Sequence, residues 1–252
     1  MEMFESPHGN VPNSYTLQPT ITGTSVMAVV YDGGVAMVTD RDAAYGHTRR
    51  YMSMCRQYRV NENVVVGFSG DYADFQWLQN VIERQEEDIK TYHTNTKLTA
   101  KGLWNYLTTL LYYRRSQMNP VWNTLVVAGK LTIRSFNSSS GMQPEPTYDN
   151  LVPFIGVISN RGVAYETKAV ATAMGQMILT ETMQRDARAR EFKYNRDEAL
   201  ELLAKMVEIM KYRDTSATGD YDITTVDAQG VTLHKPKKVV GNWDVAHYDN
   251  QY

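Results

Sequence analysis

The sequence has little cysteine, little net charge and no long apolar run. Its one cysteine, Cys55, excludes an internal disulfide framework and is typical of a protein from a reducing compartment. The formal charge of −2 offers no general attraction to nucleic acid or to an anionic membrane. No apolar stretch approaches the ~20 residues of a transmembrane helix, and residues 1–22 lack the apolar centre of a secretory signal. We therefore expect no nucleic-acid partner and no membrane partner.

Potential metal ligands are few and scattered. The five histidines lie far apart, and no two have the i, i+4 spacing that places two ligands on one face of a helix. Cys55 has no second cysteine with which to build a tetrahedral site, and we expect it to be a small core residue. The sequence therefore predicts neither a metal nor another cofactor.

Turns between β-prone runs, by contrast, recur along the chain. The first predicted hairpin joins residues 26–31 to residues 35–39 through Asp32-Gly33-Gly34, because glycine reaches the positive φ of a tight turn. Residues 41–54 predict a polar, irregular segment. Residues 131–150 are rich in Ser, Gly and Pro and predict a surface loop or the tip of an extended hairpin. Similar patterns predict further hairpins at residues 55–68, 154–166 and 222–233. They also predict a single strand at residues 124–129.

Four stretches carry the three-to-four spacing of apolar residues that predicts a helix with a buried face. The first follows Ser69-Gly70-Asp71, which we expect to break a strand and cap the helix. The others cover residues 99–115, 172–185 and 196–211, and the third of the four carries methionines at 174, 177 and 183 that we assign to the core.

The order of these elements is strands, helix pair, strands, helix pair, strands, without a strict β–α alternation. Hairpins imply antiparallel sheets, and two helix pairs can cover two outer faces. We therefore predict an α+β fold, a four-layer αββα sandwich of two antiparallel sheets between helix pairs. One domain would span residues 23–233, with an N-terminal arm or propeptide-like extension at 1–22 and a tail at 234–252.

Several short motifs go beyond these turn and strand patterns. They are Thr22-Gly23-Thr24-Ser25-Val26, Gly67-Phe68-Ser69-Gly70-Asp71-Tyr72-Ala73-Asp74-Phe75, Met118-Asn119-Pro120, Ala171-Thr172-Ala173, Tyr212-Arg213-Asp214 and Asn242-Trp243-Asp244-Val245-Ala246-His247. Together they resemble the proteasome beta-type subunits, which are N-terminal nucleophile hydrolases. The more particular motifs are similar to the non-catalytic branch called beta type 4, at the seventh position of the eukaryotic beta ring. The resemblance covers residues 15–252 apart from the 131–150 segment, and it implies the four-layer αββα fold.

The resemblance also implies positions for a catalytic site. In an active subunit of that family, a threonine hydroxyl attacks the peptide carbonyl, and the free α-amine of the same threonine serves as the base. Thr24 aligns with that nucleophile, and Asp40 aligns with the acid that holds a catalytic lysine. Gly70 aligns with the glycine whose backbone stabilises the oxyanion, and Asp214 aligns with a second acid.

Three positions depart from the active pattern. Arg56 stands at the lysine position, and arginine stays protonated and has a larger, fork-shaped head. Ala217 stands where the family has a supporting serine, and Asp42 stands where active subunits carry an arginine. We therefore expect that cleavage before Thr24 fails, that its nitrogen stays an amide, and that an Asp40–Arg56 ion pair fills an inactive site.

Two alternatives remain open at the level of sequence. One is an active threonine endopeptidase subunit with Thr24 as its N-terminal nucleophile. The other, more distant, is a free-standing N-terminal nucleophile amidase. Asp214 has a simpler interpretation as the cap of a turn after the last helix.

The tail at 234–252 is aromatic but aperiodic, which favours burial against a partner. The seventeen tyrosines agree with a chain enclosed on several sides. The resemblance implies other beta subunits of the same and the opposite ring, and alpha-ring subunits, as partners. It also implies a role in ring and half-particle assembly for ATP/ubiquitin-dependent degradation in the cytoplasm and nucleus. The residues that we expect at the interface are Trp243, Asp244, His247, Tyr248 and Tyr252.

Overall fold

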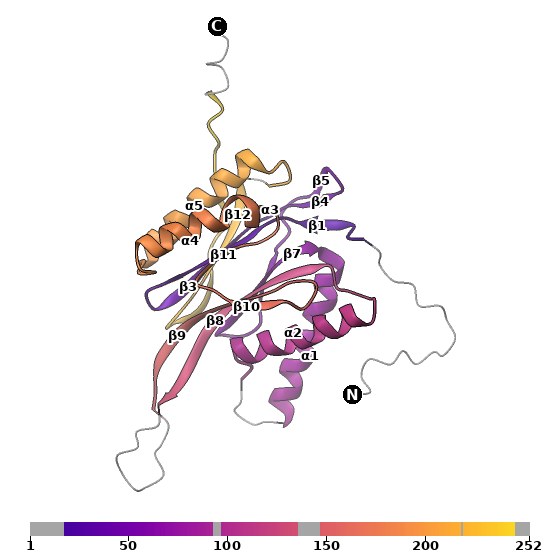
Figure 1. The fold of residues 1–252 in the computed structure, drawn as a ribbon, viewed down its shortest axis with the longest axis vertical. Coiled ribbons are helices and arrows are strands. Elements are labelled where there is room, and N and C mark those ends of the chain that lie inside the picture. The colour runs from indigo at the N-terminus through magenta and orange to yellow at the C-terminus, as the bar shows by residue number, and fades with distance from the viewer. Residues whose placement is uncertain (1–17, 93–96, 136–146, 218, 245–252) are drawn as a thin grey trace, which may run out of the picture.

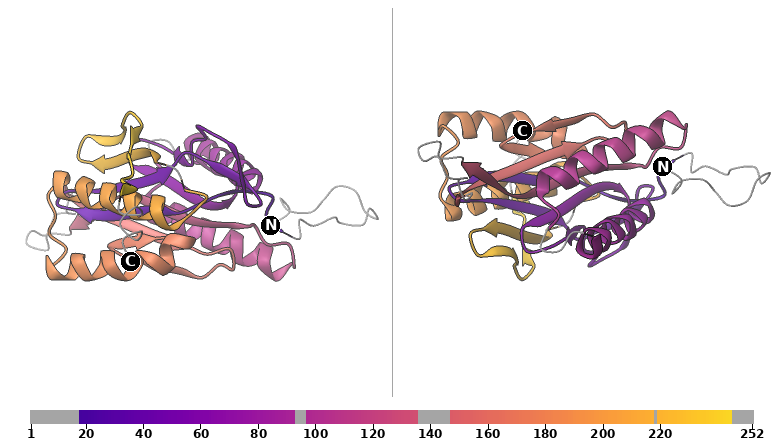
Figure 2. Two further views of the ribbon diagram at one scale, coloured as in Figure 1. Left: turned by 90° about the horizontal axis from the view of Figure 1, so that it is seen from above. Right: turned by 90° about the horizontal axis from the view of Figure 1, so that it is seen from below.

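The computed structural model describes residues 18–92, 97–135, 147–217 and 219–244. Two antiparallel sheets face each other, and helices cover the outer face of each sheet (Figures 1 and 2). This arrangement confirms the predicted α+β sandwich of four layers.

The first sheet contains eight strands: β1 (Ile21–Gly23), β4 (Ala43–Tyr45), β5 (Thr48–Tyr51), β6 (Gln57–Arg59), β7 (Val64–Asp71), β8 (Asn123–Ser135), β9 (Thr147–Ile158) and β10 (Ala164–Glu166). Their order is β10-β9-β8-β7-β1-β4-β5, with β6 also paired to β7. Strands β8 and β9 continue into the 131–150 segment as a long hairpin, so the extended hairpin predicted there is confirmed. Residues 136–146 of that segment lie outside the described residues.

The second sheet contains six strands: β2 (Val26–Tyr31), β3 (Gly34–Asp40), β11 (Ala169–Ala171), β12 (Asp220–Asp227), β13 (Gly230–Leu233) and β14 (Lys237–Lys238). Strand β3 is buried along its whole length between β2 and β12. The β2–β3 turn places Gly33 at φ 81°, a backbone conformation that favours glycine, so the predicted hairpin is confirmed. Strand β14 pairs with the start of β12 and joins the beginning of the tail to this sheet.

The five helices of the described residues form the outer layers: α1 (Tyr72–Tyr92), α2 (Ala100–Ser116), α3 (Met174–Ile178), α4 (Thr180–Ala189) and α5 (Arg196–Arg213). Buried side chains of α1 and α2 pack on the first sheet, and those of α4 and α5 pack on the second. A third cluster, which includes Val26, Val65 and Val126, fills the space between the two sheets. Among the described residues, no helix is long and apolar enough to span a bilayer.

Local side chains explain where the main helices begin. The Oδ1 of Asp71 accepts the backbone N–H groups of Ala73 at 2.9 Å and Asp74 at 3.1 Å, which is the predicted cap of α1. Helix α5 begins with a capping box, in which Asn195 and Glu198 each accept the other's backbone N–H. These caps satisfy amide groups that have no partner inside the helix.

Some local predictions are wrong. Residues 41–54 contain the β4–β5 hairpin rather than an irregular segment, because Gly46 at φ 58° allows a tight turn between two short strands. Strand β7 runs on through Asp71 instead of breaking at Ser69. Cys55 is exposed rather than buried in the core.

The prediction of a single helix at residues 172–185 is also wrong. The segment begins after the short strand β11, and Leu179 separates α3 from α4. The three methionines therefore do not share one helix face: Met183 is buried, but Met174 is 47% exposed and Met177 is 86% exposed.

Candidate functional site

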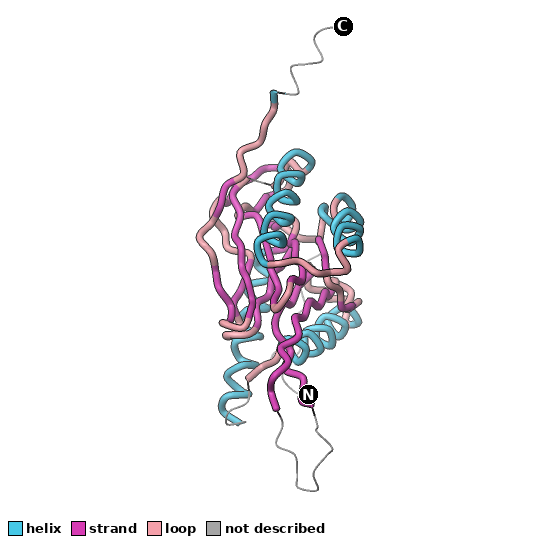
Figure 3. Tube along the Cα trace, turned by 90° about the vertical axis from the view of Figure 1, so that its left-hand side faces the viewer, coloured by secondary structure: helices cyan, strands magenta, loops and turns pink. Residues whose placement is uncertain are grey.

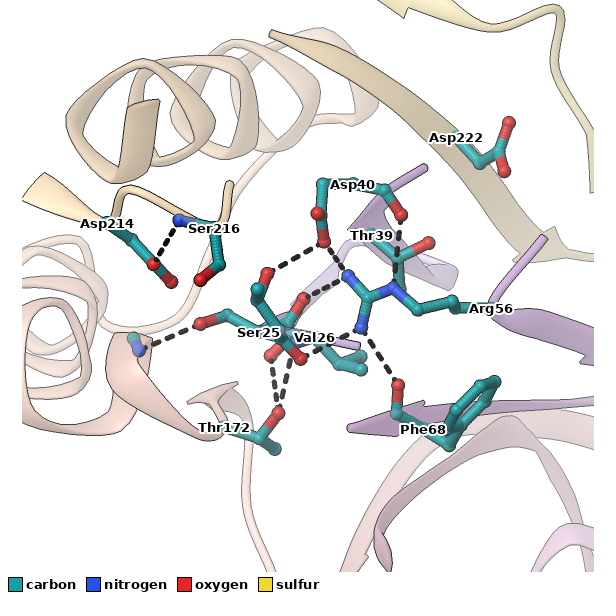
Figure 4. Close-up of polar contacts among 12 residues, drawn as sticks. Ser25, Val26, Thr39, Asp40, Arg56, Phe68, Thr172, Asp214, Ser216 and Asp222 are labelled. Atoms are coloured by element: carbon teal, nitrogen blue, oxygen red, sulfur yellow. Dashed lines mark hydrogen bonds and ion pairs between the residues drawn. The ribbon is translucent and has the colours of Figure 1, made fainter. Parts of the chain in front are cut away.

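The predicted site residues come from five separate parts of the chain. Thr24 lies between β1 and β2, Asp40 ends β3, and Arg56 immediately precedes β6. The structure brings these three into direct contact, as Figure 4 shows for the labelled residues Asp40 and Arg56. Ala217 lines a cavity together with Thr24 and Asp40, whereas Asp214 faces its own loop.

Arg56 is the centre of the site and is fully buried. Its Nη2 pairs with the Oδ1 of Asp40, and its Nε donates to the backbone carbonyl of Asp40 at 3.2 Å. Its Nη1 donates to the carbonyls of Thr24 at 2.8 Å and Phe68 at 3.0 Å, and Nη2 donates to that of Ser25 at 3.0 Å (Figure 4). The guanidinium therefore ties the start of β2 and the end of β3 to β7, across the two sheets.

The charge of this group persists at neutral pH. Burial lowers the pKa of Arg56 to about 9, while the carboxylates of Asp222 and Asp214 act in the opposite direction. A guanidinium that is still protonated has no lone pair to accept a proton from a hydroxyl. Asp40 and the surrounding carbonyls thus hold a fixed cation where the active pattern has a lysine.

The glycine before Thr24 has a structural reason to be there. A Cβ added to Gly23 would overlap the Cδ of Arg56, because the stem of the arginine packs directly against the glycine. Gly23 is therefore required by the arginine itself, whether or not the chain is cleaved after it.

The hydroxyl of Thr24 is held by a carboxylate and faces little free space. Its Oγ1 donates to the Oδ1 of Asp40 at 2.9 Å, the same oxygen that Arg56 contacts. The cavity bordered by Thr24, Asp40 and Ala217 has a volume of about 10 Å³. That volume is at the lower limit for a single water molecule, so this cavity has no room for a substrate side chain.

Gly70 lies in β7, directly opposite Gly23 of β1. Two features require glycine here: its φ is 106°, and a Cβ at this position would overlap the carbonyl oxygen of Trp122. Strand β1 pairs with β7 on one side and β4 on the other. The position in the sheet beside Gly70 is therefore occupied by β1, the strand that precedes Thr24.

The two positions after α5 serve the local backbone. Asp214 is the C-terminal cap residue of α5, and its Oδ1 accepts the N–H of Ser216 at 2.9 Å. Its carbonyl accepts the N–H of Ala217 at 3.1 Å. Asp214 thus has the turn-capping role that the sequence allowed for, and Ala217 contributes only a methyl group to the cavity.

Asp42 is buried and lies outside the Arg56 network. Its carboxylate lies 3.0 Å from Nε of Arg49, and burial raises the pKa of Asp42. Its partner therefore comes from the exposed strand β5, and no described contact joins it to Thr24.

Sequence reasoning missed two hydroxyl groups beside the site. The Oγ of Ser25 accepts the N–H of Gly175 at 2.8 Å, and the Oγ1 of Thr172 accepts that of Val26 at 2.9 Å (Figure 4). These bonds fix β2 against the start of α3. The motifs that contain Ser25 and Thr172 were the signals, and they say nothing about partners 150 and 146 residues away.

The predicted interface residues are only partly described. Trp243 is 57% exposed, and its ring lies edge-on to Tyr212 with centroids 5.1 Å apart. The N–H of Asp244 donates to the side chain of Asn242 at 2.9 Å. His247, Tyr248 and Tyr252 lie outside the described residues.

Comparisons with known proteins agree with this fold. The sequence profile of the family described as "Proteasome subunit" matches residues 20–132. The chain is 34% identical to the proteasome subunit beta type-4 of Xenopus laevis over 239 residues, which cover 95% of this chain and 91% of that protein.

Two further relatives carry the same description. The beta type-4 subunit of Arabidopsis thaliana is 30% identical over 93% of this chain and 87% of its own length. That of Drosophila melanogaster is 30% identical over 95% of this chain and 82% of its own length. The chain therefore belongs to the proteasome subunit family, and within it to the beta type-4 subunits.

Proposed function

We propose that the chain is a non-catalytic structural subunit of the 20S proteasome core particle. The observation that carries this proposal is the buried Arg56, whose guanidinium occupies the lysine position and bonds to Asp40 and to the carbonyls around Thr24. The same arginine that removes the proton chemistry also holds the site together.

Threonine catalysis needs a hydroxyl, a base to take its proton, and room for the substrate. The base of the family is the free α-amine of the threonine, Arg56 cannot shuttle a proton as the lysine does, and Ala217 offers no hydroxyl to support an α-amine. The cavity beside Thr24 holds about 10 Å³, and β1 lies along β7 next to Gly70. Each of these features separately opposes peptide attack at Thr24.

We place the function in assembly. The subunit would sit in a seven-membered beta ring, contact alpha-ring subunits and the opposite beta ring, and wall the proteolytic chamber. Such a ring of different chains needs different faces on each side of every subunit. The exposed Trp243 supports contact through the tail. A role in ATP/ubiquitin-dependent degradation in the cytoplasm and nucleus follows from this placement and is part of the proposal.

N-terminal sequencing of the chain from assembled particles tests the non-catalytic assignment. We expect every chain to begin upstream of Thr24, so that the nitrogen of Thr24 remains an amide. A population of chains that begins at Thr24 would contradict the assignment.

The alternative, an active threonine endopeptidase, is favoured by one contact, the 2.9 Å bond from Thr24 to Asp40. That contact orients the hydroxyl but supplies no base while Arg56 holds the same carboxylate. A chain cut before Thr24 in assembled particles is the result that would favour this alternative.

A further inference from the structure

The β4–β5 hairpin forms an exposed edge of the first sheet. Strand β5 is the last strand in the sheet order and pairs with β4 alone among the described strands. All four of its residues are exposed. Figure 1 shows the hairpin at the periphery of the molecule, beside β1. An edge of this kind presents unpaired backbone N–H and C=O groups to an incoming strand.

A β-bulge in this hairpin changes the direction in which one arginine side chain points. Ala43 pairs with Tyr51 and Ala44 pairs with Arg49, so Arg50 has no partner in the register. Such a bulge turns a side chain out of the regular alternation of the strand. The guanidinium carbon of Arg50 lies 5.8 Å from the ring centroid of Tyr45 and 6.0 Å from that of Tyr51. Two aromatic rings thus hold the cation in place on the surface.

The hairpin is anchored independently of that arginine. Arg49 contacts the buried carboxylate of Asp42 at 3.0 Å, which fixes β5 against the domain. Arg50, by contrast, makes no ion pair with any of the described residues. The sequence from 43 to 61 contains no aspartate or glutamate. The hairpin therefore presents an unneutralised, oriented cation between two aromatic rings.

These features match the composition of strong protein contacts. Tyrosine and arginine dominate the residues that carry binding energy at interfaces, and both rings are open to a partner, with Tyr45 51% and Tyr51 38% exposed. A guanidinium held in place loses little freedom on binding and pairs with a carboxylate through two parallel hydrogen bonds. An extended peptide can also add to the free edge of β5 through its backbone.

We propose that the β4–β5 hairpin is a docking surface for an extended, acidic segment of a neighbouring proteasome subunit. The segment adds to β5 as a further strand and places a carboxylate against Arg50. This inference rests on the proposed function, because it assumes that the chain is assembled with other subunits. A protein segment is favoured over nucleic acid because only a peptide backbone satisfies the free edge of β5, and the chain as a whole carries a charge of −2.

The test uses a tagged full-length chain in which Thr48 is replaced by the photo-crosslinking residue p-benzoylphenylalanine. Recovery of the tagged chain in a particle with many other subunits is measured first and tests the proposed function alone. Particles that contain the chain are then irradiated, and the cross-linked peptides are identified by mass spectrometry. We expect one partner subunit, linked through a segment that contains Asp or Glu within a few residues of the cross-link.

The arginine is tested in the same particles. We expect Arg50→Glu to lower the cross-link yield at least about fivefold, and Arg50→Lys to lower it less, because lysine keeps the charge but not the planar head. Arg161→Glu makes the same charge change at an exposed turn and should leave the yield unchanged. If Arg50→Glu does not enter particles, Arg50→Gln gives the same comparison without added repulsion.

Three results would overturn the inference while leaving the proposed function intact. They are cross-links from intact particles to nucleic acid, no cross-link at Thr48 in particles that contain the chain, and a yield that does not depend on Arg50.

Discussion

At the scale of single residues, Arg56 combines burial with an unusual number of acceptors. It contacts the Asp40 carboxylate and the backbone carbonyls of four residues, all within the interior of the protein. A buried charge whose partner is removed costs several kcal/mol, because the remaining charge is neither solvated nor paired. The same residue explains why glycine is required at position 23.

We therefore predict that Arg56→Ala lowers the free energy of unfolding by about 3–5 kcal/mol, because it leaves the buried Asp40 carboxylate without its cation and several carbonyls without a donor. Denaturant unfolding of the purified chain measures this loss. Arg59→Ala is the matched control on the neighbouring strand, where the side chain is exposed, and it should change stability by less than about 0.5 kcal/mol. Equal effects of the two substitutions would show that Arg56 is not the structural centre of the site.

His234 makes the stability depend on pH. Its Nε2 lies 2.9 Å from the Oγ1 of Thr225, and burial, with Arg196 and Lys237 nearby, lowers the pKa of His234. An unfolded histidine takes up a proton below a pH of about 6.5. The folded chain resists that proton, so stability is lost as the pH falls through this value and below it.

Between pH 7.5 and pH 5.5, we expect the free energy of unfolding to fall less in His234→Gln than in the unchanged chain. Urea unfolding at both values measures the difference, and other titrating groups cancel because both chains carry them. Parallel losses in the two chains would rule out His234 as the source.

The residue scale also shows how far the sequence predicts the site. The spacing of Thr24, Asp40 and Arg56 was enough to expect their contact, because a family pattern fixes those positions. The bonds from Ser25 and Thr172 were not predictable, since hydroxyl groups occur everywhere and their partners lie 150 and 146 residues away. Only the packing of α3 against β2 identifies those partners.

At the scale of elements, the start of α3 carries backbone strain. Ala173 precedes the helix with φ 51° and ψ −132°, a conformation that side chains other than glycine rarely adopt. The residue holds this conformation because the neighbouring bonds, from Gly175 to Ser25 and from Val26 to Thr172, fix the chain on both sides.

Ala173→Gly should raise the free energy of unfolding by about 1 kcal/mol, since the relief of strain exceeds the added flexibility of the unfolded chain. Ala189→Gly, at the exposed last residue of α4, is the control: it adds the same flexibility to the unfolded chain without strain to relieve, and it should not raise the free energy of unfolding. Thermal and denaturant unfolding of both variants decide the sign. A loss of stability in Ala173→Gly would mean that this backbone conformation is unstrained.

The elements that were hard to predict share a physical reason. The β2–β3 hairpin can be predicted because two apolar runs flank a glycine turn. Strands β4, β5 and β11 have only three or four residues, which is too short for a periodic pattern to be recognised, and all four residues of β5 are exposed. Pairing with neighbouring strands creates such elements, and local sequence does not encode that pairing.

At the scale of the whole molecule, the root of the tail is fixed to the domain. The N–H of Val239 donates to the carbonyl of Gly219, and the ammonium of Lys211 donates to the carbonyl of Val239, both at 2.7 Å. The hydroxyl of Tyr212 accepts the N–H of Asn242 at 2.6 Å. From this root the described chain leaves the sandwich as an extended segment (Figure 3).

Removal of residues 241–252 should therefore impair the joining of half-particles more than the folding of the subunit. The bonds of Val239 remain, and the largest described side chain that is lost, Trp243, is 57% exposed. We expect a change in unfolding free energy below about 1 kcal/mol, a range typical of surface changes, together with accumulation of half-particles on native gels. Full particles at normal yield would argue against a role for the tail in joining.

The central claim is that Thr24 is not a nucleophile, and chemical labelling of assembled particles tests it most directly. A peptide epoxyketone reacts with both the hydroxyl and the free α-amine of an N-terminal threonine. After treatment, mass spectrometry should find the adduct on the active subunits of the particle and none on this chain. An adduct at Thr24 would contradict the account, because it requires a free α-amine and an accessible hydroxyl beside Arg56.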